Sequence, residues 1–367
     1  MKIIILVFLF LTVFVLPLAF AEQQEMIWES NAPLPTPRAY FGYTSTDEKI
    51  YVIGGFDENE SALDVVEVYN TKTNSWATLA PLLEPLHHTA AAAYEGKLYV
   101  AGGTHDQQPS FLGLHFREKV RAESLFFIYD IEKNEWKRGP DIPTPRLGLT
   151  SQAINGTVYV IGGANHFPRS IFDTEHEWYS VNEEYDIESG AWQTMAPMPT
   201  PRDHVQSTVM DGKIFVIGGR QTTLKNTVSS NEVYDPSTDS WTILDPMPTL
   251  RSGMTMSSLN GTIFVYGGLA KDGSKLDVVE QYIPDEGWIT HEQLPMPLDG
   301  PGSVTIDNKI YLIGGLSEHG LIPINVSFYD PNVIPEFSSE VFLVFIVAVI
   351  LVIYLRFVPR SKILALK

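Results

Sequence analysis

The sequence contains no cysteine, and its basic residues are few. The missing thiol excludes a disulfide framework, a thiolate metal site, a cysteine nucleophile and any cofactor built from a cysteine side chain. Lys and Arg number 25 against 44 for Asp and Glu, so the 367 residues carry a formal net charge of −19. This charge repels a phosphate backbone, and nucleic acid is therefore not an expected partner.

Charge is also absent from a long stretch near the N-terminus. Lys2 precedes an apolar run over residues 3–15, and Ala19-Phe20-Ala21 supplies small residues at the spacing that a signal peptidase needs. We therefore expect residues 1–21 to be a signal peptide. The alternative is an uncleaved N-terminal anchor, and both interpretations predict that the protein is exported.

A second uncharged stretch, residues 341–355, lies near the C-terminus and is followed only by basic charges. It predicts a transmembrane helix over residues 341–358 and a basic cytoplasmic tail over residues 359–367. The preceding linker, residues 334–340, contains Pro335-Glu336-Phe337. The order Pro-Glu-Phe, hydrophobic helix and basic tail resembles the archaeal C-terminal sorting signals read by archaeosortases. This resemblance implies processing of the helix, the alternative is a permanent anchor, and both place the protein on the outer face of the cell membrane.

The region between these ends contains an internal repeat. A Gly-Gly pair recurs six times at intervals of 47 to 60 residues, and each pair ends a short apolar run such as Ile50-Tyr-Val-Ile53. Such runs of β-branched and aromatic residues bounded by glycine predict buried strands. The pairs are Gly54-Gly55, Gly102-Gly103, Gly162-Gly163, Gly218-Gly219, Gly267-Gly268 and Gly314-Gly315.

A tyrosine and then a tryptophan follow each of the first five glycine pairs, six or seven residues apart, as Tyr69 and Trp76 do. The sixth repeat has Tyr329 but no tryptophan after it. Trp28, close to the start of the mature chain, has no tyrosine before it. We infer that the strand around Trp28 is the outer strand of the repeat that contains Tyr329, so that the two ends of the chain pair.

The spacing of Gly-Gly, Tyr and Trp over about 50 residues resembles the kelch repeat. The resemblance implies an all-β fold: a six-bladed kelch-type β-propeller over residues 22–333, closed by an N-terminal strand and monomeric. Glycine, tyrosine and tryptophan then build the scaffold. Glu67, Glu232 and Glu280, each two residues before a repeat tyrosine, are expected to pair with scaffold arginines.

If the strands of each blade are lettered a to d from the axis outward, the b–c loops and the d–a connections emerge on one face. Most connections are rich in proline and end in an arginine, which is expected at the mouth of the central channel. Ion pairing with glutamates is the favoured role of these arginines, and a set that binds an anion is the alternative. They are Arg38, Arg146, Arg202 and Arg251, with His87-His88 and Asp299-Gly300 in blades two and six.

The b–c loops of blades two and three are about ten residues longer than the others, and long loops on a rigid scaffold often carry function. All nine histidines map near the same face. We therefore predict a recognition surface for a protein or glycan of the cell surface, built from these loops and the connection histidines. Its candidate residues are Phe111, His115, Phe116, Arg117, His166, Phe167, Arg169, His176, Trp178, Tyr179, His87 and His204.

No metal or other cofactor is expected, since neither His-x-His nor His-Glu-x-x-His spacing occurs. Acidic b–c loops over residues 57–64 and 272–277 lack the spacing of an EF-hand, so we interpret them as solvated, with calcium binding as the alternative. Glycosylation sequons that suit an exported protein occur at Asn59, Asn155, Asn260 and Asn325.

The kelch resemblance favours an interaction scaffold, because kelch propellers most often bind partners, and no catalytic residue is predicted. Exported relatives include copper radical oxidases, but these need a tyrosine joined to a cysteine, which is absent here. A sugar mutarotase or epimerase at the channel mouth is the enzymatic alternative, because it needs only converging Glu, Arg and His side chains. A purely structural protein of the cell envelope is the third hypothesis.

Overall fold

The six apolar runs that end in Gly-Gly form six buried strands. The computed structural model describes residues 28–105, 121–166, 176–221 and 226–329, and all of them belong to one unit, Glu25–Asp330. In each run the four residues after the first are buried. These strands are β3 (Lys49–Ile53), β7 (Lys97–Ala101), β11 (Thr157–Ile161), β15 (Lys213–Ile217), β19 (Thr262–Tyr266) and β23 (Lys309–Ile313).

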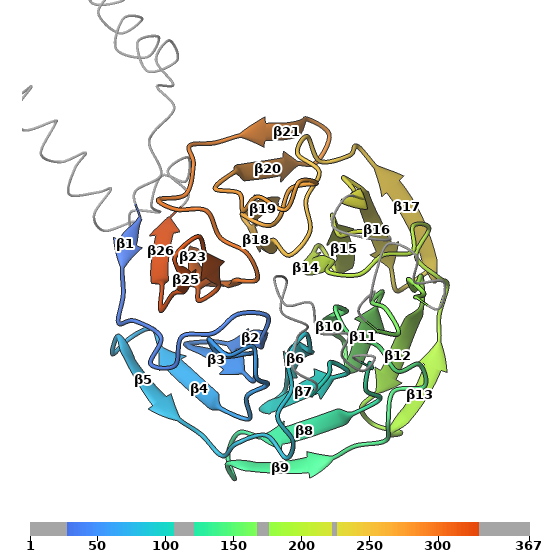
Figure 1. The fold of residues 1–367 in the computed structure, drawn as a ribbon. Coiled ribbons are helices and arrows are strands. Elements are labelled where there is room, and N and C mark those ends of the chain that lie inside the picture. Colours follow the sequence, from blue (N-terminus) through green and yellow to red (C-terminus); the bar gives the residue numbers. More distant parts are fainter. Residues whose placement is uncertain (1–27, 106–120, 167–175, 222–225, 330–367) are drawn as a thin grey trace, which may run out of the picture. The chain divides into compact units, whose positions relative to one another are not determined.

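Each buried strand is the second of four antiparallel strands, and the six sheets surround a central axis (Figure 1). The innermost strands are β2 (Gly42–Thr46), β6 (Ala90–Tyr94), β10 (Thr150–Ile154), β14 (Gln206–Met210), β18 (Thr255–Leu259) and β22 (Gly302–Ile306). The third strands are β4 (Val66–Asn70), β8 (Phe126–Asp130), β12 (Asn182–Asp186), β16 (Asn231–Asp235), β20 (Val279–Ile283) and β26 (Asn325–Tyr329). The outermost are β5 (Ser75–Thr78), β9 (Glu135–Arg138), β13 (Ala191–Thr194), β17 (Ser240–Leu244), β21 (Gly287–Thr290) and β1 (Glu29–Ser30). The predicted six-bladed all-β propeller is thus confirmed.

The sixth blade combines both ends of the described chain, as predicted. Its strand order is β22-β23-β26-β1, and Glu29 and Ser30 of β1 pair with Ser327 and Val326 of β26. The N-terminal strand therefore supplies the outer strand of the last blade. A ring closed by backbone hydrogen bonds between the chain ends has no free edge between its first and last blades.

The register of this blade corrects one detail. In blade one Ile50 lies opposite Tyr69, whereas in blade six Ile310 lies opposite Phe328, one residue before Tyr329. Phe328 therefore takes the place of the repeat tyrosine, and its ring lies 4.6 Å from that of Trp28. Counting from the glycine pair gave the wrong residue, because the b–c loop of blade six is one residue shorter than that of blade one. This loop contains the hairpin β24 (Leu316–Ser317) and β25 (Gly320–Leu321).

The Gly-Gly pairs lie where neighbouring blades touch. The second glycine of each pair donates its N–H to a carbonyl of the next blade, as Gly55 does to Leu86 over 2.8 Å, and the same bond recurs in all six blades. The first glycine has no room for a side chain, because a Cβ on Gly54 would come within 2.3 Å of the same Leu86 carbonyl. The pair is therefore required by the approach of two backbones.

The repeat tryptophans hydrogen-bond to the connection that leads from the preceding blade into their own blade. The indole N–H of Trp76 donates to the carbonyl of Ala32, that of Trp136 to Ala80 and that of Trp241 to Ala196, over 2.8–2.9 Å. These indoles are half-buried in the outermost strands. The predicted scaffold role of the tryptophans is confirmed.

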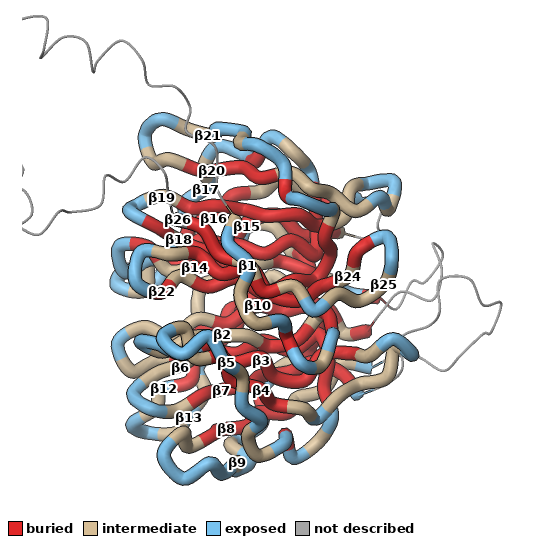
Figure 2. The backbone as a smooth tube through the Cα atoms, turned by 90° about the vertical axis from the view of Figure 1, so that its left-hand side faces the viewer, coloured by how far each residue is buried: buried red, intermediate tan, exposed pale blue. Residues whose placement is uncertain are grey.

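The propeller has two different faces. We call the face with the b–c loops and d–a connections the loop face, and the face with the a–b and c–d turns the hairpin face. Strand β26 begins beside Ile313, next to the loop face, and ends at Tyr329 beside Lys309, next to the a–b turn. Figure 2 shows the propeller from the side, with the loop hairpin β24–β25 at one edge. The chain therefore enters at Trp28 and leaves after Tyr329 on the hairpin face.

The predictions for the chain ends lie outside the described residues: the signal peptide, the sorting motif, the transmembrane helix and the basic tail. Within residues 28–105, 121–166, 176–221 and 226–329, no helix is both long and apolar enough to span a membrane.

Deletion of residues 22–32 tests the closure of the ring. It removes β1 and the contact of Trp28 with Phe328, so we expect the free energy of unfolding to fall by more than about 3 kcal/mol. Urea denaturation measures this loss. Ser30→Ala, which keeps the backbone pairing, is the matched control, and a deletion variant as stable as that control would contradict the closure.

Candidate functional site

Six residues at the start of the innermost strands close the channel at the loop face. Each lies two positions after the scaffold arginine or its replacement, has a φ between 50° and 64°, and donates its N–H to the carbonyl of the same position in the preceding blade. The six hydrogen bonds, 2.7–3.3 Å long, form a closed circle. We call these residues the axial ring: Tyr40, His88, Gly148, His204, Gly253 and Gly300.

Three members of the axial ring are not glycine although all six have left-handed backbone. This conformation costs a residue with a side chain roughly 1–2 kcal/mol. The rings of Tyr40 and His88 stack with centroids 4.2 Å apart, and that of His204 lies 5.0 Å from His88 and 5.5 Å from Tyr40. Side chains from blades one, two and four therefore meet on the axis, and their mutual packing offsets the backbone strain.

Charged groups surround these rings. Tyr40 donates its hydroxyl to Asp299 over 2.5 Å, and Arg220 donates its Nε–H to Asp203 over 2.9 Å. Arg220 Nη2 also lies 3.3 Å from His204 Nε2. Asp203, Arg220 and Asp299 together with Tyr40, His88 and His204 form what we call the axial cluster. His87 adjoins it, with its Nδ1 2.6 Å from Nδ1 of His88.

The cluster sets the charge of its members. Burial, then the neighbouring His87, His204 and Arg220, hold the pKa of His88 well below its usual value. Burial and Arg220 also lower the pKa of His204, so both imidazoles are neutral at neutral pH. Burial opposes ionisation of Asp203, yet Arg220 and His204 bring its pKa below the usual range.

Asp299 behaves in the opposite way. Burial raises its pKa to about 7, because loss of hydration outweighs the hydrogen bond from Tyr40. The same removal from water and the nearby Asp299 carboxylate raise the pKa of Tyr40 well above its ordinary value. The cluster therefore holds a carboxylic acid that changes charge near neutral pH.

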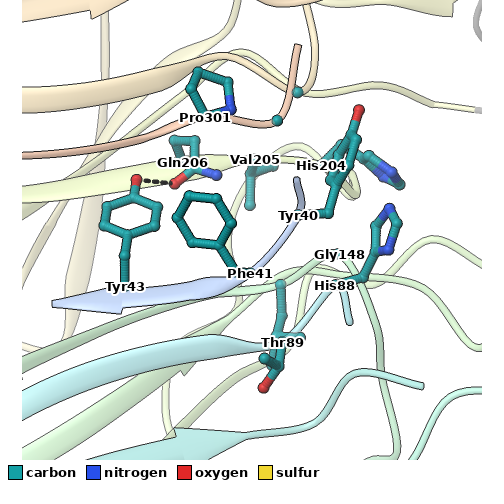
Figure 3. Close-up of a pocket in the computed structure, with 13 residues that line it drawn as sticks. Tyr40, Phe41, Tyr43, His88, Thr89, Gly148, His204, Val205, Gln206 and Pro301 are labelled. Atoms are coloured by element: carbon teal, nitrogen blue, oxygen red, sulfur yellow. Dashed lines mark hydrogen bonds between the residues drawn. The ribbon is translucent and has the colours of Figure 1, made fainter. Parts of the chain in front are cut away.

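Behind the axial ring the channel is filled by side chains. Tyr43 of β2 crosses the axis and donates to Gln206 of β14 over 2.8 Å (Figure 3), and its hydroxyl lies 2.9 Å from that of Thr255. Two small cavities of about 30 and 50 Å³ remain beside it. Each has room for water molecules but not for a sugar ring.

The four scaffold arginines are not at the channel mouth, which corrects that expectation. Their side chains are fully buried, with exposed fractions of 0%. Each forms an ion pair of 2.5–2.9 Å with the glutamate two residues before the repeat tyrosine. The pairs are Arg38–Glu67, Arg146–Glu183, Arg202–Glu232 and Arg251–Glu280. The ion-pair prediction is confirmed, and the anion-binding alternative fails because no ligand can reach these groups.

Blades two and six lack both partners of this ion pair. Leu86 and Phe127 take the two positions in blade two, and Leu298 and Val326 take them in blade six. Leu86 and Phe127 belong to one hydrophobic cluster, and Val326 packs against the cluster that contains Leu298. Each blade therefore has either a complete ion pair or a complete apolar pair, as expected when an isolated buried charge is costly.

Part of the predicted recognition surface lies outside the described residues: Phe111, His115, Phe116, Arg117, Phe167 and Arg169. Of the others, His166 and His176 are buried, so the described structure does not place them on an exposed recognition surface. Trp178 and Tyr179 are half-buried, and the Trp178 ring lies 4.1 Å from that of His176. His87 and His204 lie at the axial cluster and are buried too.

The bases of the two long loops are joined. A β-bridge connects Arg121 with His166, and Ala122 donates its N–H to the carbonyl of Asn165 over 3.0 Å. The residues at the C-terminal end of the blade-two loop therefore pair with residues of the blade-three loop. This pairing agrees with the prediction that the two loops share one surface.

Sequence reasoning missed Tyr40, Asp203 and Arg220 of the axial cluster, and it named His88 and Asp299 only as residues that replace the arginine pattern in blades two and six. A signal existed, because three blades have glycine two positions after the scaffold residue and the others have tyrosine or histidine. Among the described residues no group of three or more His, Asp or Glu side chains is arranged to hold a metal ion. The carboxylates of the acidic loops make local turns, as Asp57 does by accepting the N–H groups of Asn59 and Ser61.

Replacing one buried ion pair tests the coupling between its partners. Arg38→Leu leaves Glu67 buried without its cation and should lower the free energy of unfolding by about 3–5 kcal/mol. Adding Glu67→Val reproduces the Leu298–Val326 pair of blade six and should restore most of that loss. Denaturant titration measures this coupling when it is applied to the wild type, both single variants and the double variant. If the two losses of stability simply added in the double variant, the coupling would be contradicted.

The pH dependence of stability tests the protonation of Asp299. The folded protein keeps this proton up to about pH 7, whereas an unfolded Asp loses it near pH 4. The raised pKa therefore stabilises the wild type at low pH, and this contribution is lost as the pH rises from about 4 to 7, by up to roughly 4 kcal/mol. The stability difference between the wild type and Asp299→Asn should fall over this range and level off above it. A difference independent of pH would show that Asp299 titrates normally.

Comparison with known proteins agrees with this architecture. Residues 50–319 match the family model described as the Attractin/LZTR1 beta-propeller. Beta-scruin of Limulus polyphemus is 30% identical over 192 residues, which are 52% of this chain and 20% of that protein. Kelch-like protein terF of Aspergillus terreus is 28% identical over 200 residues, 53% of this chain and 41% of that protein.

Kelch-like protein 41b of Danio rerio is 25% identical over 193 residues, 52% of this chain and 28% of that protein. The matches thus span about a fifth to two fifths of the length of these curated relatives. The solved structure of YjhT superimposes with a TM-score of 0.68 over 81% of this chain and 95% of the other, at 16% identity, which shows the fold alone. Because the family model covers most of the propeller, the chain belongs to the Attractin/LZTR1 beta-propeller family and is a kelch-type six-bladed β-propeller.

Proposed function

We propose that this protein is an interaction scaffold on the outer face of the cell membrane, which binds a protein or glycan partner through the loop face of its propeller. The kelch-repeat relatives support the general role of a protein-binding propeller. The export signal, the anchor, the Pro335-Glu336-Phe337 sorting motif and the choice of loops are part of the proposal.

The observation that carries the proposal is the direction of the last strand. Because β26 runs from the loop face to the hairpin face, the chain leaves the propeller after Tyr329 on the hairpin face. A membrane anchor over residues 341–358 would therefore attach to that face. The loop face, which has the long loops of blades two and three, would then be free to meet a partner.

The closed channel distinguishes this proposal from a mutarotase-like enzyme at the channel mouth. Such an enzyme needs a sugar-sized opening, whereas the axial ring closes the mouth and leaves a cavity of about 30 Å³ behind it. The scaffold arginines and glutamates are also paired inside the blades, as Arg38 is with Glu67 and Arg146 with Glu183, so they do not converge on the channel mouth. These features favour binding on the outside of the loop face.

Substitution of Trp178 tests the binding surface. Full-length protein purified in detergent is immobilised and screened against surface-protein and glycan fractions of the source organism. We expect Trp178→Ala to weaken any saturable interaction at least tenfold, because tryptophans at interfaces contribute much of the binding energy. Ile243→Ala is the matched control, since Ile243 is 70% exposed on the outermost strand β17.

Each outcome of this screen is decisive. Equal binding by Trp178→Ala and the wild type would move the contact surface away from the long loops. Absence of any saturable partner would favour the structural role in the cell envelope. Protease treatment of intact cells tests the location, and a propeller protected from protease would contradict surface exposure.

A further inference from the structure

Two of the six a–b hairpins carry the sequence Asn-Gly-Thr. They are residues 155–157 in blade three and residues 260–262 in blade five. The asparagine and glycine have left-handed backbone, with φ of 49° and 82° in the first hairpin and 53° and 73° in the second. These angles are those of a two-residue type I′ turn, in which Asn-Gly is the favoured pair. The turn therefore explains the asparagine and the glycine.

The turn does not explain the threonine. In the other four blades the equivalent first residue of the second strand is lysine: Lys49, Lys97, Lys213 and Lys309. The fold therefore accepts lysine at this position. Threonine replaces it only in the two blades whose turn begins with asparagine, and the replacement completes the Asn-x-Thr acceptor sequence for N-linked glycans.

Both hairpins are accessible. Asn155 and Asn260 are exposed, and no atom lies within 4 Å of a Cβ placed on Gly156 or Gly261, so the tips of the turns are surrounded by open space. Both asparagines project from the hairpin face. An enzyme that modifies the folded protein can therefore reach either amide.

The two remaining sequons differ. Asn325 is buried in β26, between β23 and β1, and its Nδ2 donates to the carbonyl of Ala32 over 2.9 Å. Asn59 is exposed, but its Nδ2, the atom that a glycan would take, donates to the Asp57 carboxylate over 3.5 Å. The hairpins of blades three and five are thus the sequons in which an exposed asparagine lies at the tip of a turn that is surrounded by open space.

We propose that Asn155 and Asn260 carry N-linked glycans on the hairpin face, an inference that rests on the proposed export of the protein. The donor is a glycan activated at its anomeric carbon by a phosphate leaving group. A bond forms between that carbon and the asparagine Nδ2, the anomeric C–O bond to phosphate breaks, and the amide proton leaves with the phosphate. The modification involves no change of redox state.

The position of these sites agrees with the binding face proposed above. The glycans would project from the face on which the chain enters and leaves the propeller. Bulky hydrophilic groups there keep the hairpin face from packing against another protein. The loop face carries neither of these two sites and stays open to a partner.

The full-length protein is isolated from the source organism, and peptides that contain each sequon are analysed by mass spectrometry. We expect glycan mass on Asn155 and Asn260 and none on Asn325. Thr157→Lys and Thr262→Lys import the residue of the other four blades, keep the Asn-Gly turn, and should each remove one glycan. Thermal denaturation of the Thr262→Lys variant checks that it remains folded, because the Thr262 hydroxyl donates to Leu259 and accepts from Gln281.

A gain of modification is the sharper test. Asp211→Asn combined with Lys213→Thr creates Asn-Gly-Thr in the equivalent hairpin of blade four and should add a third glycan. Unmodified Asn155 and Asn260 on a protein that protease reaches on intact cells would overturn the glycan sites but leave the proposed function standing. Unmodified residues on a protein that protease cannot reach would overturn both. A glycan on Asn325 would show that the folded structure does not select the sites.

Discussion

The backbone contact between neighbouring blades is the constraint on which the rest of the structure depends. Two circles of six hydrogen bonds surround the axis, one through the axial ring and one from the second glycine of each Gly-Gly pair. Both circles need the blades to approach until backbone meets backbone, which is why a side chain on Gly54 would collide with a carbonyl oxygen. The blades are consequently held at a fixed separation, and the channel is closed at the loop face.

The buried charges follow from this close approach. In four blades an arginine at the end of the connection pairs with a buried glutamate. The guanidinium of this arginine also donates to backbone carbonyls, as that of Arg146 does to Val181 over 2.9 Å. Burial lowers the pKa of Arg38 to about 10, so it remains charged at neutral pH. The blades with Leu86 and Leu298 replace the whole pair by apolar side chains. Each blade thus has a complete ion pair or a complete apolar pair, as expected when an isolated buried charge is costly.

At the axis the close approach of the blades brings together the axial cluster, whose side chains are not repeated from blade to blade. Tyr40, His88 and His204 accept a backbone conformation that suits glycine, and they connect three blades through ring contacts and through Asp203, Arg220 and Asp299. Among the described residues this cluster fills the axis at the loop face and leaves only small cavities of about 30 and 50 Å³ behind it. In the function that we propose, the exit of the chain on the opposite face leaves the loop face for recognition.

The sequence by itself determined the repeat, the number of blades, the closure by the strand after Trp28 and the ion pairs of Glu67, Glu232 and Glu280. The repeat, the number of blades and the ion pairs depend on spacing along the chain, because strands within most blades are neighbours in sequence. The closure follows from the two incomplete repeats at the ends of the described chain. The tertiary structure alone decided that Phe328 packs on Trp28, that the arginines lie inside the blades, and that His88, His204 and Asp299 share one buried cluster. The axial cluster joins residues from different blades, the contact with Trp28 joins the two ends of the described chain, and the burial of the arginines depends on how closely the blades pack. No local sequence pattern records any of these.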